Sequence, residues 1–493
     1  MFSSLPAWLN NIIPILLLLL GVTVVISRLP KIDVGHSKAY RKRRLMNWLP
    51  LGLTYALLYM GRYNLTVSKS VFESIPGSNG NSLMGNEAFG IIFGIGTVVY
   101  GVSFIINGPL TDRFGGRFSM LLGTGGTLLV NLFMGLATFS LLEQGPGSDF
   151  IAKNFVEVFS ILYALNMYFQ SFGAVAIVKV NAAWFHVRER GVFGAIFGIL
   201  ISLGLYFAYD WGKLVLDNMG LVWVFIAPAL LLAVFWIIDY FLVRDTPGET
   251  GYQNFDTADA TSGDKGPRMG AIRVFMMMLK NPIIMTIAII EFCSGFLRQA
   301  IMQWYRTFAK QTDGILGLQK GFISENWGLL LCLAGILGGV VAGVISDHVF
   351  GSRRGPVAAW LYGVMLTGSL ILIFLFKTQM VGIVVLVMSV AVIGVHGMLS
   401  GTASMDFGGS KNAGIAVGII DGFVYLGTAV MSFTYALLLP KEQLDAAGKI
   451  VGPATEPANW IAWPLAMIPI AVIGLLLAIR IWRAFPGAQK SKA

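Results

Sequence analysis

Charged residues, cysteine and histidine are scarce in this chain, and each shortage excludes a class of protein. Only 12% of the 493 residues are charged and 56% are hydrophobic, a balance foreign to a soluble domain. The two cysteines, Cys293 and Cys332, stand in apolar runs, where they are packing residues rather than a disulfide. The four histidines offer little metal chemistry. Motifs of nucleotide hydrolases, zinc proteases and serine hydrolases are missing from suitable contexts, so we expect no enzyme, no cofactor and no metal site.

Long apolar runs dominate the sequence instead. A helix of about twenty apolar residues crosses the hydrocarbon core of a bilayer, so the runs predict an all-α membrane protein. The first run, Trp8 to Ile26, is followed rather than preceded by basic residues, which predicts a retained anchor and not a cleaved signal peptide. Twelve further spans are expected near residues 47–69, 87–110, 118–141, 155–182, 191–213, 220–243, 283–308, 327–346, 356–377, 380–403, 413–438 and 460–481.

The basic residues predict how these spans are oriented. The net charge is +10, but Lys and Arg gather in short loops on alternate sides of the apolar runs, as the positive-inside rule requires, so we expect no nucleic-acid partner. The N-terminus is then outside and the C-terminus is in the cytoplasm. Residues 273–280 predict a short amphipathic helix on the inner surface. The expected segments are an N-terminal anchor (1–30), a basic cytoplasmic loop (31–46), a first six-helix half (47–243), a cytoplasmic linker (244–281), a second six-helix half (282–481) and a basic cytoplasmic tail (482–493).

An internal repeat supports the division into halves. Gly108 and Gly343 are 235 positions apart, and so are Asp112 and Asp347, in two loops of similar sequence. Repeats of this kind build transporters whose site lies at the midplane between the halves. The charges of the two loops can pair in one state and separate in the other, so the loops predict a gate. Its expected residues are Asp112, Arg113, Arg117, Asp347, Arg353 and Arg354.

Two arginines, Arg62 and Arg298, stand inside apolar runs and are 236 positions apart, close to the spacing of the repeat. A cation at that depth costs several kcal/mol unless it faces a cavity or a partner. One arginine from each half would form a clamp for an anion, because the guanidinium fork gives phosphate two parallel charge-assisted hydrogen bonds. The alternative for Arg298 is an ion pair with Glu291, two helical turns earlier on roughly the same face.

Several stretches resemble known transporters. Gly108-x-x-x-Asp112-Arg113-x-Gly115-Gly116-Arg117 is similar to the loop signature of the major facilitator superfamily. More narrowly, the loop 343–355 and the stretches 170–173, 184–191 and 411–427 resemble the organophosphate:phosphate antiporters, the family of glycerol-3-phosphate and hexose-phosphate transporters. The resemblance implies the major facilitator fold, with two pseudo-symmetric six-helix halves plus the extra N-terminal helix. It also implies exchange of an organophosphate for inorganic phosphate by alternating access, and short loops favour a bacterial inner membrane.

The resemblance also suggests site residues. Arg62 and Arg298 fall where the family holds its phosphate, and Lys179 is expected either to add a cation to the cavity or to anchor a helix near the inner face. Phe104 and Ile201 stand where glycerol-phosphate members carry lysine and histidine. Tyr63 and Gln303 replace a Lys–Asp pair. The substrate-binding residues expected are Arg62, Arg298, Tyr55, Tyr59, Tyr100, Gln170, Lys179 and Tyr425.

These departures leave three functions open. The first is antiport of a small organic phosphate against inorganic phosphate. The second is proton-coupled symport of another organic anion, such as a sugar acid, with Glu291 or Asp421 as the proton or charge partner. The third is a membrane sensor of sugar phosphate. The expected partners are a small anionic substrate, inorganic phosphate and the lipid bilayer, and we expect a monomer.

Overall fold

A computed structural model describes residues 35–77, 82–186, 190–255, 257, 271–345, 349–350, 354–400, 404–446 and 448–483. For residues 190–197, 271–272, 343–344 and 404–414 it describes the backbone only. The expected anchor, Trp8 to Ile26, and the expected gate residues Asp347 and Arg353 lie outside the described residues.

Helices account for nearly all of the described structure. Among the described residues, ten helical segments are long and apolar enough to cross a membrane, and a shorter apolar helix covers Trp327–Ala342. The first half contains α2 (Lys38–Phe72), α3 (Asn86–Phe114), α4 (Gly116–Leu142), the short α5 (Ser148–Lys153), α6 (Phe155–Trp184), α7 (Arg190–Tyr206), a π-helical turn (Phe207–Trp211), α8 (Gly212–Met219) and α9 (Trp223–Leu242).

The second half repeats this series. After α10 (Ala271–Leu279) it contains α11 (Pro282–Gln311), the short α12 (Asp313–Leu316) and α13 (Phe322–Glu325), α14 (Trp327–Val344), α15 (Arg354–Leu375), α16 (Val381–Met398), α17 (Ser404–Leu438), the strands β1 (Gln443–Leu444) and β2 (Ile450–Val451), and α18 (Ala462–Arg480). The two strands pair antiparallel as a small hairpin. The observed helices follow the expected core spans and confirm the predicted all-α membrane fold.

Two local differences have clear causes. Helix α2 begins at Lys38, inside the segment expected to be a loop, because the Ser37 side chain caps it by accepting from the backbone N–H of Tyr40. The Tyr40 hydroxyl then donates to the carbonyl of Trp184, which holds this first turn against α6. The amphipathic helix expected at 273–280 is α10. Its buried residues, four apart, pack against α11 and α17.

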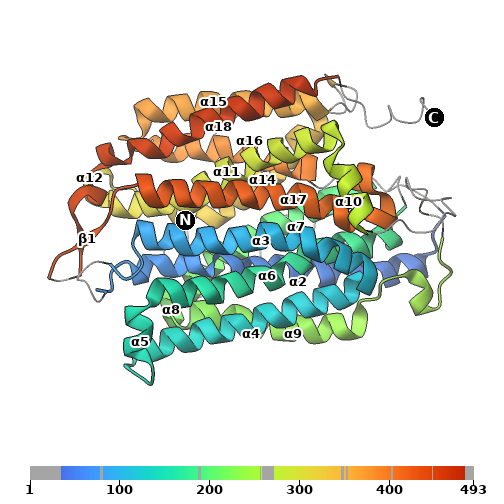
Figure 1. Cartoon of the computed structure of the whole chain (residues 1–493), viewed down its shortest axis with the longest axis horizontal. Coiled ribbons are helices and arrows are strands. Elements are labelled where there is room, and N and C mark those ends of the chain that lie inside the picture. Colours follow the sequence, from blue (N-terminus) through green and yellow to red (C-terminus); the bar gives the residue numbers. More distant parts are fainter. Residues whose placement is uncertain are drawn as a thin grey trace, which may run out of the picture.

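The long helices run side by side along the long axis of the molecule (Figure 1). The first half, blue to green, lies below the second half, yellow to red. The two ends of the helix bundle carry different elements. We call the end with β1–β2, α5 and α12 the hairpin end. We call the opposite end, with α10 and the residues that follow α9, the linker end.

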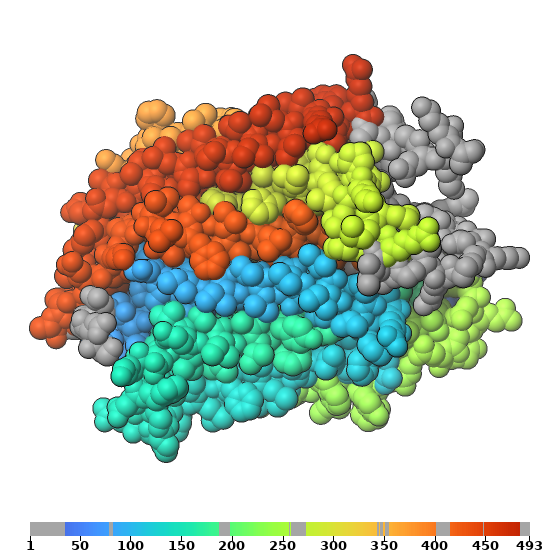
Figure 2. Space-filling view, viewed as in Figure 1, coloured from blue at the N-terminus to red at the C-terminus, as the bar shows by residue number. Residues whose placement is uncertain are grey.

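Small residues bring the helices of the two halves close together. Helix α17 lies along α3 on the face in Figure 2, orange beside blue. A Cβ at Gly101 would lie 2.9 Å from the carbonyl oxygen of Gly422, and one at Gly422 would lie 3.0 Å from that of Gly101. In the second half, a Cβ at Gly427 would lie only 2.0 Å from the carbonyl oxygen of Phe292 in α11. Glycine at these places permits the backbone contact that membrane helices use to associate.

Candidate functional site

Arg62 is almost fully enclosed in the middle of α2, with 1% of its surface exposed. Each nitrogen of its guanidinium donates to a neutral oxygen. Nε donates to Gln170 Oε1 at 2.9 Å, Nη1 to the Tyr425 hydroxyl at 2.8 Å and Nη2 to the Tyr100 hydroxyl at 2.5 Å. Since Tyr425 belongs to α17, one of the three bonds crosses between the halves. Each of the three guanidinium nitrogens of Arg62 therefore has a hydrogen-bond partner, and none of these partners carries a charge.

Aromatic rings complete the surroundings of Arg62. The guanidinium carbon lies 4.5 Å from the ring centre of Tyr59 and 4.7 Å from that of Tyr100, within the range of a cation–π contact. Tyr55 packs edge-on against Tyr59 at 5.6 Å. Phe104 stacks on Tyr425 at 5.7 Å. The structure thus brings five of the expected binding residues to Arg62, and Phe104 adds an apolar wall.

Helix α6 fixes the position of Arg62 along the axis of the helix bundle. The Tyr163 hydroxyl donates to the carbonyl oxygen of Arg62 at 2.9 Å, and the Asn166 amide donates to that of Gly61 at 2.7 Å. Both residues come from the helix that supplies Gln170. The same helix therefore positions both the backbone and the side chain of the arginine.

Arg298 is in a different electrostatic situation. It is 4% exposed, and its Nε and Nη2 are buried without a hydrogen-bond partner among the described residues. Glu291 is not paired with it, because this carboxylate lies about 10 Å away along the axis of α11 and contacts His396 Nδ1 at 2.8 Å. Asp421 is bonded to the hydroxyl of Ser400. A buried cation without a partner is costly, so Arg298 is equipped to bind an anion.

The two arginines lie at the same level of the bundle. Tyr63 and Gln299, the residues that directly follow them, are joined by a hydrogen bond of 2.8 Å between α2 and α11. One turn closer to the hairpin end, the Thr66 hydroxyl donates to Gln303 Oε1. The repeat spacing of 236 therefore corresponds to a physical register between the halves. Neutral side chains maintain this register, Tyr63 through its bond with Gln299 and Gln303 through its bond with Thr66.

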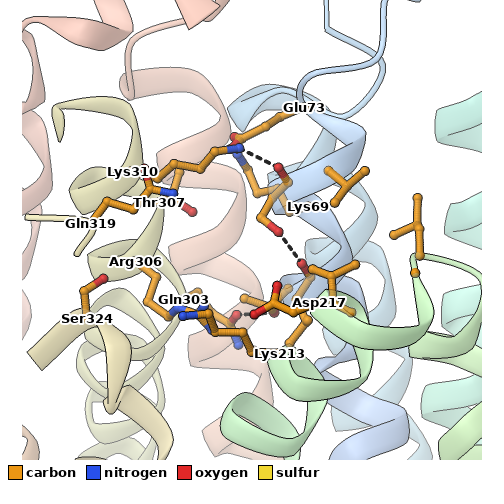
Figure 3. Close-up of a pocket in the computed structure, with 17 residues that line it drawn as sticks. Lys69, Glu73, Lys213, Asp217, Gln303, Arg306, Thr307, Lys310, Gln319 and Ser324 are labelled. Atoms are coloured by element: carbon orange, nitrogen blue, oxygen red, sulfur yellow. Dashed lines mark hydrogen bonds and ion pairs between the residues drawn. The ribbon is translucent and has the colours of Figure 1, made fainter. Parts of the chain in front are cut away.

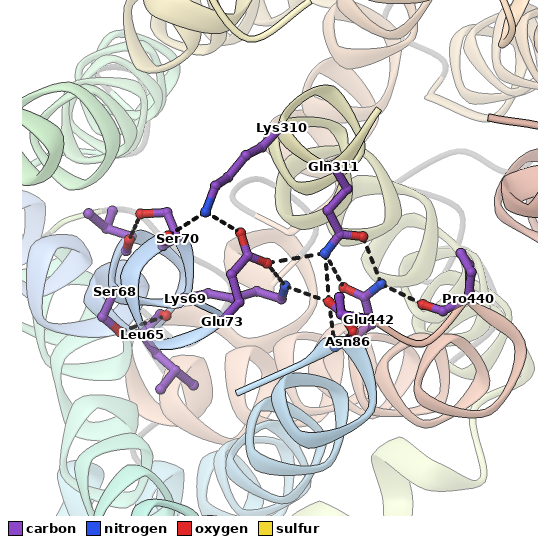
Figure 4. Close-up of polar contacts among 11 residues, drawn as sticks. Leu65, Ser68, Lys69, Ser70, Glu73, Asn86, Lys310, Gln311, Pro440 and Glu442 are labelled. Atoms are coloured by element: carbon purple, nitrogen blue, oxygen red, sulfur yellow. Dashed lines mark hydrogen bonds and ion pairs between the residues drawn. The ribbon is translucent and has the colours of Figure 1, made fainter. Parts of the chain in front are cut away.

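A buried polar network joins the halves at the hairpin end (Figure 4). Glu73 forms ion pairs of 2.6 Å with both Lys69 and Lys310. Glu442, between α17 and β1, accepts from the Asn86 backbone N–H at 2.8 and 2.9 Å. Its further donors are Gln311 at 2.6 Å and Lys69 at 3.4 Å. We call these six residues, Lys69, Glu73, Asn86, Lys310, Gln311 and Glu442, the hairpin-end network.

Sequence reasoning did not find the hairpin-end network. The available signal was the pair Lys69 and Glu73, four residues apart at the end of an apolar span, but nothing in the sequence points to Glu442 as its partner across the halves. Burial alone would raise the pKa of the Glu73 carboxyl, and the two lysines outweigh this effect and lower the pKa below its ordinary value. Glu73 is therefore held as a carboxylate.

Residues 51–432 match the family model described as Major Facilitator Superfamily. The chain belongs to the Major Facilitator Superfamily. This membership confirms the predicted fold, an integral multi-pass membrane location, and the prediction that the chain is a transporter-type protein rather than an enzyme.

Curated relatives within the superfamily are similar over most of their length. The glycerol-3-phosphate transporter of Bacillus subtilis (strain 168) is 24% identical, over 93% of this chain and 96% of its own. The membrane sensor protein UhpC of Escherichia coli (strain K12) is 23% identical, over 83% and 88%. The probable hexose phosphate transport protein of Chlamydia pneumoniae is 22% identical, over 93% and 95%.

A solved structure shows the same fold. The bacterial homolog of the human lysosomal transporter Spinster, in an inward-facing and unoccupied conformation, matches with a TM-score of 0.61 and 16% identity. The alignment covers 91% of this chain and 97% of that one.

The superfamily signature loop lies at the linker end. The Arg117 backbone N–H donates to Asp245 at 2.8 Å, and its Nη2 donates to the carbonyl oxygen of Tyr240 at 2.6 Å, so this arginine joins α4 to the end of α9. Arg113 lies over the ring of Phe114. In the second half, Arg354 Nη1 donates to the carbonyl of Met398 at 3.3 Å. These contacts each stay within one half.

The contacts of Lys179 fit the second of its two expected roles, the anchoring of a helix. It lies nine residues after Gln170 on α6, about 13 Å further toward the linker end, and its Nζ is 2.7 Å from Asp112 of α3. The ion pair fixes the ends of two helices in the first half. Lys179 therefore does not join the cluster around Arg62, because the helix carries it to a different depth.

Proposed function

We propose that this protein carries a small organic phosphate across the membrane in exchange for inorganic phosphate. The observation that carries the proposal is Arg298, a buried guanidinium with two unpartnered nitrogens at the level of Arg62, on the interface between the halves. Relatives named as glycerol-3-phosphate and hexose phosphate transporters support the same substrate class. Glycerol phosphate and sugar phosphates are the candidates.

The geometry around the two arginines suggests how an anion would bind. Phosphate oxygens would accept from Nε and Nη2 of Arg298, and on the other side they would replace the hydroxyls of Tyr100 and Tyr425 on Arg62. A dianion forms stronger, charge-assisted bonds than a phenol oxygen does. Tyr59, Tyr55 and the released hydroxyls would then face the organic part of the substrate.

Alternating access follows from the cross-half contacts. In this structure the halves are bonded to each other on the hairpin side of the arginines, through Tyr63–Gln299, Thr66–Gln303 and the hairpin-end network. Opening of the hairpin side breaks these bonds. An anion shared by Arg62 and Arg298 would keep the halves in contact during this opening. Without an anion Arg298 is left unpaired at the moving interface. Return of the empty carrier is therefore disfavoured, which makes the transport an exchange.

The distribution of Lys and Arg supports an orientation for this cycle. We place the linker end, the segment 31–46 and the tail 482–493 in the cytoplasm, and the hairpin end outside a bacterial inner membrane. The linker 244–281 then joins two six-helix halves, 47–243 and 282–481. The expected gate residues would close the cytoplasmic side when the hairpin end opens. They are Asp112, Arg113, Arg117, Asp347, Arg353 and Arg354.

Phosphate exchange in proteoliposomes tests the proposal. Vesicles loaded with phosphate and containing the full chain should take up labelled phosphate, and Arg62→Ala and Arg298→Ala should each reduce the rate more than 100-fold. That factor corresponds to about 3 kcal/mol, typical for removal of one partner of a buried charge pair. Arg480→Ala, an exposed arginine at the end of α18, is the matched control and should exchange normally. Exchange that survives in both site variants would refute the assignment.

The similarity to the sensor UhpC supports a second candidate, a membrane sensor that binds a sugar phosphate without transporting it. Such a protein would bind labelled glucose 6-phosphate through Arg298 yet show no exchange in vesicles. Proton-coupled symport is the third candidate, with the buried pair of Glu291 and His396 or the carboxyl of Asp421 as the proton carrier. An imposed pH gradient would drive uptake in that case, and Glu291→Gln or Asp421→Asn would abolish the effect, whichever removes the carrier.

A further inference from the structure

A cavity of about 430 Å³ lies between the halves, on the hairpin side of the Thr66–Gln303 bond. Helices α2 and α8 of the first half and α11 of the second half form its walls (Figure 3). The cavity opens to the surface beside Gln319 and Gly220, both of which are exposed. Its volume is within the usual range for sites that hold small molecules.

The charged side chains around this cavity are unbalanced. Its walls carry four cations and two carboxylates: Lys69, Lys213, Arg306, Lys310, Glu73 and Asp217. Lys69 and Lys310 are already paired with Glu73 in the hairpin-end network. Arg306 and Lys213 make neither a hydrogen bond nor an ion pair with any described residue. The walls therefore have an excess of two positive charges, and two unpaired cations supply it.

No carboxylate is committed to Arg306 within the described part of the chain. The half-buried Asp210 lies nearby, but both its oxygens accept from backbone N–H groups at the start of α14, from Gly328 and Leu329 at 2.8 Å each. Asp217 is exposed at the rim of the cavity. Asp210 and Asp217 attract Arg306 electrostatically, but neither forms an ion pair with it in the described structure. A guanidinium that is partly withdrawn from water and has no bonded counter-charge can receive an anion.

We propose that this cavity is a second anion site, in which Arg306 and Lys213 hold the phosphate group of a phosphate ester or inorganic phosphate. The excess of two charges matches a dianion. The neutral donors Thr307 and Gln319 line the same space and would contact the remaining oxygens. Arg306 lies eight residues beyond Arg298 on α11, about 12 Å along the axis, so the site precedes the arginine pair on a path from the hairpin end. Its role as an entry site rests on the proposed function, whereas the binding of the anion does not.

A cysteine in the cavity wall tests this proposal. Gln319→Cys places a thiol in the exposed rim, and the native Cys293 and Cys332 are buried. In the full-length protein in lipid nanodiscs, the anionic reagent methanethiosulfonate ethylsulfonate should react about tenfold faster than its trimethylammonium analogue. This factor is the lower end of the increase in association rate that a charged cleft causes. Inorganic phosphate and glycerol 3-phosphate should both slow the reaction, and glycerol should not.

Charge variants identify the residue responsible. Arg306→Gln in the Gln319→Cys protein should remove both the preference for the anionic reagent and the protection by phosphate, whereas Arg306→Lys should retain them. Lys377→Gln removes an exposed cation from the same end without touching the cavity and is the matched control. Equal reaction rates of the two reagents, or protection that persists in Arg306→Gln, would refute the second site.

Arg298→Gln separates this proposal from the transport function. Protection by phosphate in this variant, which removes the central cation, would establish the cavity as an anion site whether or not the protein exchanges phosphate. Protection that is lost in Arg298→Gln but kept in Arg306→Gln would assign the anion to the arginine pair and overturn the inference. Size-exclusion profiles of each variant in nanodiscs distinguish loss of the site from loss of the fold.

Discussion

The substitution Glu442→Gln should favour separation of the two halves at the hairpin end. The substitution keeps the size of the side chain and removes the charge that binds the Asn86 backbone, Gln311 and Lys69. A hydrogen bond to a charged group contributes about 1 kcal/mol more than a neutral one. Three such contacts amount to roughly 3 kcal/mol, and the population with an open hairpin end should rise about 150-fold relative to the closed one.

Distances between spin labels on the two halves measure this change. Lys153 and Ala458 are exposed at the hairpin end, one in each half, and accept labels after substitution by cysteine. Glu442→Gln should add a population at longer distance. Glu87→Gln is the matched control, because its ion pair with Lys441 links the same two segments but is largely exposed, and exposed pairs contribute little. An unchanged distance in Glu442→Gln, or an equal shift in Glu87→Gln, would refute the argument that the buried network closes this end.

Three further outcomes are expected. Gly427→Ala should prevent stable folding, because its Cβ would lie 2.0 Å from a backbone oxygen of α11, and thermal melting in detergent would show the loss; normal melting would contradict the close contact. Lys179→Gln should leave phosphate affinity at the arginines within about threefold, since its ion pair with Asp112 lies about 13 Å away, and a larger loss in a binding titration would return Lys179 to the site. Because the folded-state pKa of Glu73 is lowered, its stabilising effect is present above the ordinary carboxyl pKa of 4.5 and is lost as pH falls through the lowered value, so the same spin labels should report opening in acid and not at neutral pH.

The sequence allowed the helices and the depth of the key cations to be predicted. Apolar length and the positions of turn residues determine where a span begins and ends, and the repeat keeps Arg62 and Arg298 in register, as the bond between Tyr63 and Gln299 shows. These properties depend on neighbours along the chain. They can therefore be inferred without knowledge of how the helices pack.

Contacts between helices were harder to predict. Whether Lys179 faces the cavity or Asp112 depends on its depth and on the rotation of α6, which apolar periodicity leaves undetermined. The second partner of Lys69, after Glu73, is Glu442, which lies in a loop 373 positions later. Glu291 and Arg298 are about 10 Å apart along the axis of α11, and the carboxylate contacts His396, from α16, instead. Each outcome depends on three-dimensional packing among helices that are distant in sequence.

Helix α17 links the site to the closed end of the molecule. It carries Tyr425, which bonds to Arg62, and it runs without interruption for 13 more residues to Leu438, about 20 Å away. Four residues later comes Glu442, the centre of the hairpin-end network. In the proposed cycle, an anion that takes the place of the Tyr425 hydroxyl would release α17 from Arg62, and the same helix leads to the network that joins the halves at the hairpin end. Substrate binding and opening of the hairpin end would then depend on a single helix, and a ligand too small or too weakly charged to displace the tyrosine would occupy the site without moving α17.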